Sequence, residues 1–179
     1  MRRPILYLIV CAAPPAQSIQ EFVAKIQQNE WDVCIIATPQ ATRFIHAQLL
    51  TELTGYMVRS DYKLPGEADP LPKADVILVM PETFNTINKW AGGIGDTLAV
   101  SILCEALERG TTPIITVPCL KMDLVRHPIF AKSVALLREC GVVILHEPER
   151  YPSPQMMPQE VVLAELQNLI GEIRQGEDL

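Results

Sequence analysis

The chain contains five short apolar runs that are separated by longer segments with a helical pattern. The runs are rich in isoleucine and valine, and they cover residues 5–10, 33–37, 76–80, 113–117 and 142–145. Apolar and polar residues do not alternate within them, which is typical of strands that are buried on both faces of a sheet. The runs therefore predict a parallel β-sheet.

The segments between the runs favour helices. Residues 18–26 place their apolar side chains at the three- and four-residue spacing of one helix face. The same spacing recurs in three further segments, and Gly110 and Gly141 follow two of them as stop signals. These segments are residues 96–109, 129–140 and 158–173. Alternating strands and helices predict a doubly wound α/β fold.

The first fifteen residues allow two interpretations. Arg2 and Arg3, an apolar run and Cys11 resemble the layout of a bacterial export or lipoprotein signal. The run is only about as long as a strand, however, and the bulky Ile9 and Val10 stand where a lipoprotein signal has small residues. We therefore interpret the run as the first central strand, and we expect a cytoplasmic protein.

Composition excludes several classes of function. The 179 residues favour a single domain, and no apolar stretch approaches the roughly 20 residues that a membrane-spanning helix needs. A net charge of −6 disfavours nucleic acid and anionic lipid as partners. The five cysteines form no C-x-x-C pair, which favours free thiols in a reducing compartment. The three histidines lack the spacing of zinc ligands, so we expect no metal site.

Standard nucleotide motifs are absent from the sequence. There is no Walker loop, and residues 92–95 contain three glycines without the G-x-G-x-x-G spacing. Ligands of open α/β sheets nevertheless bind at the carboxyl ends of the strands, where the amino end of the next helix offers free N–H groups to a phosphate. In this chain, Ala12 and Ala13 stand in that position after the first run.

Four segments together carry a family resemblance. They are Ala-Thr-Pro-Gln-Ala-Thr-Arg-Phe-Ile at 37–45, Pro-Glu-Thr-Phe-Asn-Thr at 81–86, Gly-Ile-Gly-Asp-Thr-Leu at 93–98 and Pro-Cys-Leu-Lys at 118–121. This set resembles the homo-oligomeric flavin-containing cysteine decarboxylase superfamily. The superfamily includes phosphopantothenoylcysteine decarboxylases, peptidyl-cysteine decarboxylases of lantibiotic synthesis and flavin prenyltransferases. Within it, the sequence is similar to a bacterial branch with the pattern PxTFNTxNKWAxGIxDTL, apart from Glu82 in a slot for a small residue.

The resemblance implies a three-layer Rossmann-like sandwich with a parallel sheet of about six strands. It also implies bound FMN and homotrimers, or multiples of trimers, with the flavin at the subunit contact. The implied cofactor-binding residues are Ala12, Ala13, Ser18, Thr38, Phe44, Pro81, Thr83, Asn85 and Thr86. Taken alone, Asn85 and Thr86 also fit a plain helix cap, and Asp96 fits an N-cap equally well.

The resemblance divides the chain into three parts. Residues 1–146 correspond to the flavoprotein domain, residues 147–158 form a proline-rich linker, and residues 159–179 form a C-terminal helix. That helix either belongs to the same domain or clasps a neighbouring subunit. Residues 61–73 read as a long loop, which makes them a candidate lid or substrate loop.

The sequence also departs from the family at positions that matter for chemistry. Ala12-Ala13 replaces the usual Gly-Ser of the phosphate loop, and Ser18 is a candidate to supply the missing hydroxyl. No histidine occurs between His46 and His127, although the decarboxylases carry one in this interval. Lys121 stands where the family has an asparagine that contacts substrate.

Two classes of function remain open. In the first, the protein is an FMN enzyme with redox or decarboxylase-like chemistry on a small thiol, carboxylate or peptide substrate. Glu67 is then a candidate base, and Lys121 is a candidate to bind a substrate carboxylate or phosphate. In the second, Glu67 and Lys121 are surface residues, and the protein binds FMN without turnover and acts through a partner. Cys119 follows a predicted strand beside the expected flavin, and its default role is inert packing. His127 precedes a predicted helix, and its default role is to cap that helix.

Overall fold

The computed structural model describes residues 2–177, with side chains up to residue 173. Within that range, five parallel strands form one sheet in the order β2-β1-β3-β4-β5. The strands are β1 (Ile5–Val10), β2 (Asp32–Ala37), β3 (Val76–Glu82), β4 (Ile114–Pro118) and β5 (Val143–Ile144). The predicted α/β fold is confirmed, with five strands in place of about six. The segment after β5 contains four prolines, which cannot donate to a strand ladder.

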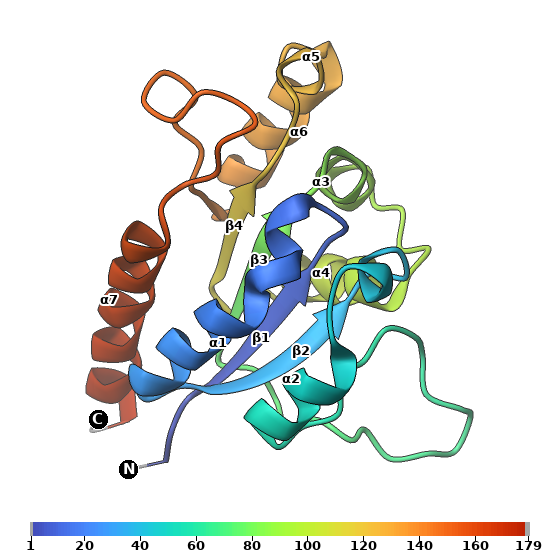
Figure 1. Cartoon of the computed structure of the whole chain (residues 1–179), viewed down its shortest axis with the longest axis vertical. Helices are drawn as coiled ribbons and strands as arrows, with labels where there is room; N and C mark the ends of the chain where they lie inside the picture. Colours follow the sequence, from blue (N-terminus) through green and yellow to red (C-terminus); the bar gives the residue numbers. More distant parts are fainter. Residues whose placement is uncertain (1, 178–179) are drawn as a thin grey trace.

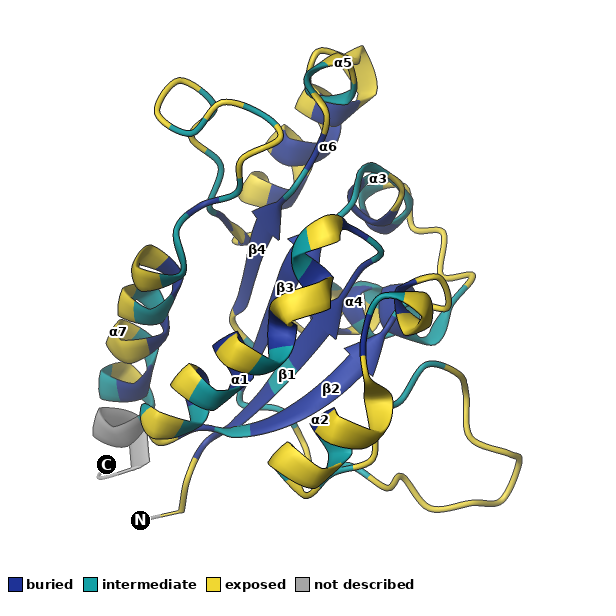
Figure 2. Ribbon diagram, in the orientation of Figure 1, coloured by how far each residue is buried: buried dark blue, intermediate teal, exposed yellow. Residues whose placement is uncertain are grey.

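The strands are buried on both faces, as their continuous apolar runs predict. In β1, Leu6 and Leu8 belong to one hydrophobic cluster, whereas Ile9 belongs to the cluster on the opposite face, because successive side chains alternate across a strand. The dark core of the sheet in Figure 2 shows this burial for all central strands. Residues 5–10 therefore form the central strand that the sequence predicts.

Helices cover both faces of the sheet (Figure 1). The helices α1 (Ile19–Gln28) and α7 (Gln159–Glu177) pack on one face, where α2 (Ala47–Thr54) contributes Leu50. The opposite face is covered by α3 (Phe84–Ala91), α4 (Leu98–Arg109) and α6 (Pro128–Glu139). Shorter pieces are η1 (Pro14–Ser18), η2 (Ala41–Arg43) and α5 (Met122–Val125).

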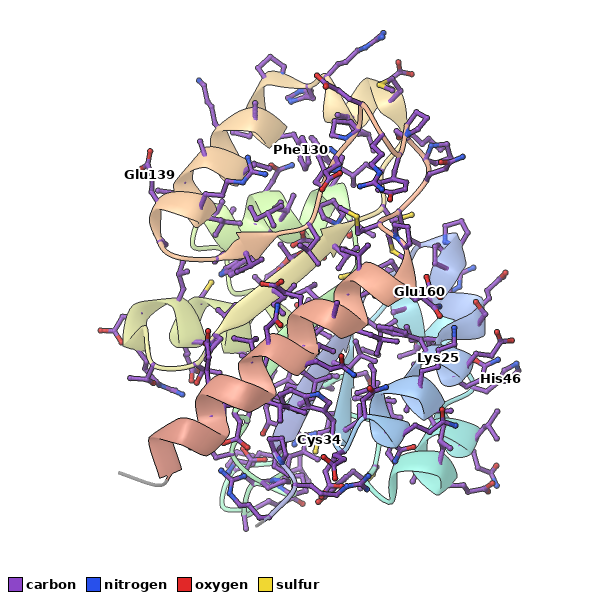
Figure 3. All side chains as sticks on the ribbon, turned by 90° about the vertical axis from the view of Figure 1, so that its left-hand side faces the viewer. Lys25, Cys34, His46, Phe130, Glu139 and Glu160 are labelled. Atoms are coloured by element: carbon purple, nitrogen blue, oxygen red, sulfur yellow. The ribbon has the colours of Figure 1, made fainter. Side chains whose placement is uncertain are left out.

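The helix α7 lies against the same hydrophobic cluster as α1. Its buried residues are Val162, Leu166 and Ile170. At its start, Glu160 approaches Lys25 of α1, with 3.9 Å between Oε1 and Nζ (Figure 3). The apolar face of this helix is thus covered within the chain.

The residues that cap or end the helices are largely those that the sequence predicts. Gly110 ends α4 with a φ of 62°, a left-handed conformation that favours glycine. His127 caps α6, because its Nδ1 accepts a hydrogen bond of 3.2 Å from the backbone N–H of Ile129. Thr97, rather than Asp96, caps α4 through a bond of 3.3 Å from the Val100 N–H.

The long loop between α2 and β3 crosses the surface without forming a helix or strand of its own, and residues 61–70 are exposed. No helix among the described residues is long and apolar enough to cross a bilayer.

Candidate functional site

The carboxyl ends of four strands meet at one edge of the sheet. Backbone hydrogen bonds hold the segments together: Thr38 N–H donates to Val10 at 2.9 Å, Cys11 N–H to Pro81 at 3.1 Å, and Cys119 N–H to Glu82 at 2.9 Å. A cavity of about 840 Å³ opens at this edge. Its size lies within the range of roughly 300–1,000 Å³ that is typical of ligand pockets.

Seven of the eleven predicted site residues line this cavity. They come from the segments after β1, β2, β3 and β4, and they are Ala12, Ala13, Thr38, Thr83, Asn85, Thr86 and Lys121. Apolar side chains form much of the remaining wall, including Phe84, Val100, Leu120 and Leu124. The cavity thus combines an apolar wall with a set of hydroxyl and amide groups.

Four predicted residues lie elsewhere. Ser18 is exposed, and its hydroxyl donates to the Pro15 carbonyl at 3.4 Å. Phe44 is half-buried against the cluster on the α1 face, and Pro81 is buried within β3. Glu67 is exposed in the long loop, where its Oε2 accepts from the Leu64 N–H at 3.0 Å. The structure does not bring Glu67 to the cavity.

The first turn of α3 lines the cavity. Thr83 is the N-cap residue, but its hydroxyl makes no capping bond and instead lies 3.1 Å from the Thr86 hydroxyl. Asn85 is exposed on the first turn. Because the first N–H groups of a helix have no intrahelical acceptor, this end presents donors and a partial positive charge.

Charged groups lie at the rim of the cavity. Lys89 and Asp96 form an ion pair, with 2.5 Å between Nζ and Oδ2. Lys121 is exposed just after β4 and belongs to no ion pair among the described residues. The sequence analysis did not predict that Lys89 lines this rim and pairs with Asp96, which follows it by seven residues.

The proline-rich segment reaches the same cavity. Pro154 lines it, and its carbonyl lies 3.6 Å from the Cys119 Sγ. Burial raises the pKa of the Cys119 thiol, which favours the neutral form over a reactive thiolate. Neither Pro154 nor its contact with Cys119 has a signal in the sequence.

Two polar residues lie behind the cavity wall. Cys11 is fully buried, and its Sγ lies 3.3 Å from the Thr86 hydroxyl. Burial raises the pKa of this thiol to about 12. Glu82 is also fully buried, and burial raises its carboxyl pKa to about 8, although a hydrogen bond from Thr116 acts in the opposite direction.

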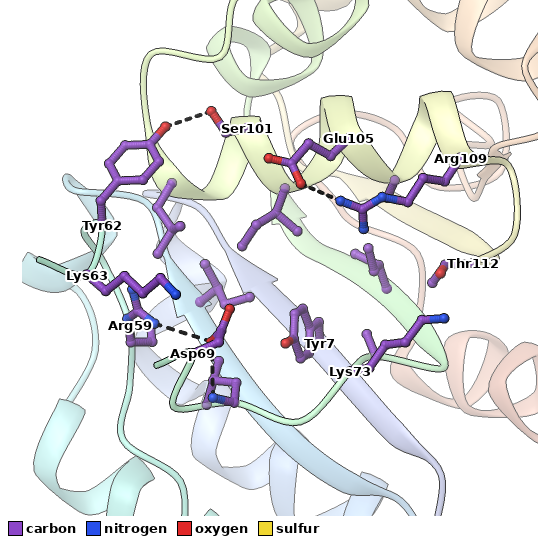
Figure 4. Close-up of a pocket in the computed structure, with 17 residues that line it drawn as sticks. Tyr7, Arg59, Tyr62, Lys63, Asp69, Lys73, Ser101, Glu105, Arg109 and Thr112 are labelled. Carbon is purple, nitrogen blue, oxygen red and sulfur yellow. Dashed lines mark hydrogen bonds and ion pairs between the residues drawn. The ribbon is translucent and has the colours of Figure 1, made fainter. Parts of the chain in front are cut away.

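A second cavity, of about 450 Å³, lies between β1, α4 and the long loop (Figure 4). Several polar side chains in it pair with one another. Arg59 lies 3.8 Å from Asp69, Arg109 lies 2.5 Å from Glu105, and the hydroxyls of Tyr62 and Ser101 are 2.6 Å apart. The first cavity is the stronger candidate site, because it lies at the carboxyl edge of the sheet and contains the predicted site residues.

Comparisons with known proteins show the family of the chain. The model of the family described as Flavoprotein matches residues 2–178. The bifunctional coenzyme A biosynthesis protein CoaBC of Thermococcus kodakarensis is 32% identical over 146 residues, which are 75% of this chain and 35% of the relative. The chain therefore spans about a third of the length of that relative.

Solved structures share the fold. The FMN-dependent cysteine decarboxylase SpaF superposes with a TM-score of 0.77 at 20% identity, over 94% of this chain and 98% of that one. The FMN binding protein AtHal3 superposes with a TM-score of 0.74 at 18% identity, over 93% and 96%.

Proposed function

The chain belongs to the Flavoprotein family, and from that premise we propose that it binds FMN in the cavity at the carboxyl end of the sheet. One observation carries this proposal: predicted cofactor residues from three separate segments line a single cavity, at the edge where open α/β sheets bind ligands. Two proteins of the same fold add support, because SpaF is an FMN-dependent enzyme and AtHal3 is an FMN binding protein.

The side chains of the cavity suit both ends of this cofactor. The amino end of α3 and the hydroxyls of Thr83 and Thr86 offer donors to a phosphate, and Thr38 offers another from the end of β2. Val100, Leu120 and Leu124 supply an apolar surface for a flat ring. Ala12 and Ala13 let the chain pass close to the ligand, because their side chains are short.

Bound FMN would supply oxidation and reduction to a protein whose own side chains lack redox chemistry of that kind. We propose redox or decarboxylase-like chemistry on a small thiol or carboxylate substrate. In that role Lys121, a cation at the rim, binds the substrate carboxylate. The other predicted catalytic residue, Glu67, lies outside the cavity, and we assign it no step.

The position of Glu67 favours a second candidate function. With no predicted base in the cavity, the chain is then an FMN-binding protein that acts through a partner and not through turnover. AtHal3, which has the same fold, is described as an FMN binding protein.

The two functions differ in how the bound flavin responds. An enzyme of the first kind bleaches its flavin absorption when a thiol or carboxylate substrate is added without oxygen, and Lys121→Ala slows the bleaching while FMN affinity is kept. Flavin that no candidate substrate bleaches supports the second function.

We further propose a cytoplasmic homotrimer, or a multiple of it, and the three-part division 1–146, 147–158 and 159–179. Five free cysteines support a reducing compartment. The contacts of α7 with the chain's own core favour the C-terminal helix as part of the same domain.

FMN binding is tested by titrating the purified protein with FMN and following the flavin fluorescence. We expect Asn85→Ala to weaken the affinity roughly 10- to 150-fold, since one hydrogen bond to a charged group contributes about 1.5–3 kcal/mol. Asn168→Ala is the matched control, because Asn168 is an exposed amide on α7. A protein that is colourless and binds no added FMN contradicts the proposal.

A further inference from the structure

Glu82 is a buried carboxyl group that forms no ion pair among the described residues. Its exposed fraction is 0%, and Thr116 Oγ1 donates to its Oε2 at 2.5 Å. Among the described residues, its Oε1 has no hydrogen-bond partner. Burial raises its pKa to about 8, and no positively charged group in the described part of the chain contributes to this shift. Because a buried carboxylate without a counter-ion is costly, the neutral acid is the favoured form at neutral pH.

This carboxyl lies directly behind the wall of the candidate site. Thr83, the next residue in the chain, lines the cavity. The Glu82 carbonyl accepts from the N–H of Cys119, which also lines it. On the other side, the Cys11 Sγ contacts the Thr86 hydroxyl in the wall, and Glu82 lies close enough to Cys11 that its ionised form raises the pKa of that thiol. One layer of residues therefore separates Glu82 from a bound ligand.

Three other titratable groups at this edge, Cys11, Cys119 and His146, favour their neutral forms near pH 8. Burial raises the pKa of Cys11 to about 12 and raises that of Cys119. Burial lowers the pKa of His146, beyond β5, so that its ring is neutral. The remaining charged groups that line the cavity are Lys89, Asp96 and Lys121.

We propose that Glu82 is held as a neutral carboxylic acid behind the cavity wall, and that its ionisation at alkaline pH weakens the binding of the anionic cofactor. The effect on cofactor binding rests on the proposed function, whereas the protonation state of Glu82 does not. A phosphate monoester loses its second proton near a pKa of about 6, so the phosphate of the cofactor keeps its charge between pH 7 and pH 9. Any loss of affinity between pH 7 and 9 then reports on the protein.

The test compares FMN affinity at pH 7 and pH 9 at constant ionic strength. For the unmodified protein we expect the dissociation constant to rise by up to about tenfold, the largest change that ionisation of one group with a pKa of about 8 can cause between pH 7 and pH 9. For Glu82→Gln we expect a change of less than about twofold, because the amide does not ionise. The same rise in Glu82→Gln as in the unmodified protein overturns the proposal.

Two further variants make the test specific. Glu108→Gln is the matched control, because Glu108 is exposed on α4, away from the cavity lining, and this variant should behave like the unmodified protein. Thr116→Val removes a hydrogen bond that lowers the pKa of Glu82, so the loss of affinity should begin at a higher pH. A purely structural role for Glu82 predicts no such shift.

Infrared spectroscopy of the protein without flavin tests the protonation state directly. We expect the C=O band of a protonated carboxyl that disappears with a midpoint near pH 8 and is missing in Glu82→Gln. A midpoint below pH 6 overturns the neutral acid. If no flavin binds at any pH, the proposed function fails, and so does the proposed effect of Glu82 on cofactor affinity. The infrared band still decides whether Glu82 is protonated.

Discussion

Glu82 and Thr116 form a polar contact inside an otherwise apolar sheet. The two side chains lie on neighbouring strands, β3 and β4, and both are fully buried. Their hydrogen bond satisfies one carboxyl oxygen and leaves the other to the low-dielectric interior. Such a pair stabilises the fold only while the carboxyl is neutral.

This pair predicts a pH-dependent stability difference. The pKa of Glu82 rises from about 4.5 in the unfolded chain to about 8 in the folded one. Between these values the folded state holds more protons, so the stability contributed by Glu82 is complete below the lower pKa and is lost as pH rises to the upper one. Relative to Glu82→Gln, the unmodified protein should lose about 1.4 kcal/mol of unfolding free energy per pH unit in this window.

Urea unfolding of both proteins at pH 5, 6, 7 and 8 measures this difference. A difference that stays constant across the series contradicts the buried-acid assignment. Glu108→Gln serves again as the surface control, because it changes the same group at an exposed position.

At the scale of elements, α7 provides one side of the core. Its buried residues pack on the cluster that also contains the α1 residues Phe22 and Ile26. The helix follows a proline-rich segment that crosses the carboxyl edge of the sheet, where Pro154 reaches the cavity. The last part of the chain therefore contributes to both the core and the candidate site.

We expect Leu166→Ala, in the middle of α7, to destabilise the protein by about 2–5 kcal/mol, because it deletes a buried side chain and leaves a cavity. Val161→Ala is the control on the same helix: Val161 is 38% exposed, and we expect a change of less than about 0.5 kcal/mol. Urea unfolding measures both. Equal, small effects would show that α7 adds little to the stability of the core.

At the scale of the whole molecule, several large apolar side chains remain exposed on α2 and in the loop that follows it. They are Leu49, Leu53, Met57, Tyr62 and Leu64, with Leu64 at 68% exposure. Exposed apolar side chains can contribute to a contact between proteins. This feature is compatible with the proposed homotrimer.

Light scattering after gel filtration tests the oligomer. We expect a mass of three times the 19.9 kDa chain, or a multiple of that trimer, independent of dilution in the micromolar range. A mass of one chain at every concentration would contradict the proposal. Measuring Asn85→Ala in parallel shows whether the assembly requires bound flavin.

The order of strands and helices was predictable because the patterns that encode it are local. A continuous apolar run such as residues 33–37 fits a doubly buried strand, and the run became β2. The end of α4 at Gly110 was also predictable from local sequence, because glycine readily adopts the left-handed conformation that ends this helix. The run at residues 142–145 became the short β5. The helix α2 was not predicted, because its eight residues make only about two turns and leave little room for a repeating pattern.

The candidate site was predictable in part. Thr38 and Thr83 directly follow strands, and the carboxyl ends of parallel strands meet at one edge, so their convergence follows from the fold. Glu67 lies in a loop with no such constraint, and its place outside the cavity depends on the path of the loop across the surface.

The sequence by itself determined the α/β architecture and the residues at the strand ends, because periodicity and strand termini act over a few neighbouring residues. Only the tertiary structure decided that Glu82 is buried against Thr116 and that Pro154 joins the cavity wall. Those contacts join segments about 30 residues or more apart in the chain, and the packing of the sheet selects them. The charge state of the site therefore depends on how the sheet packs around Glu82, which the sequence alone does not show.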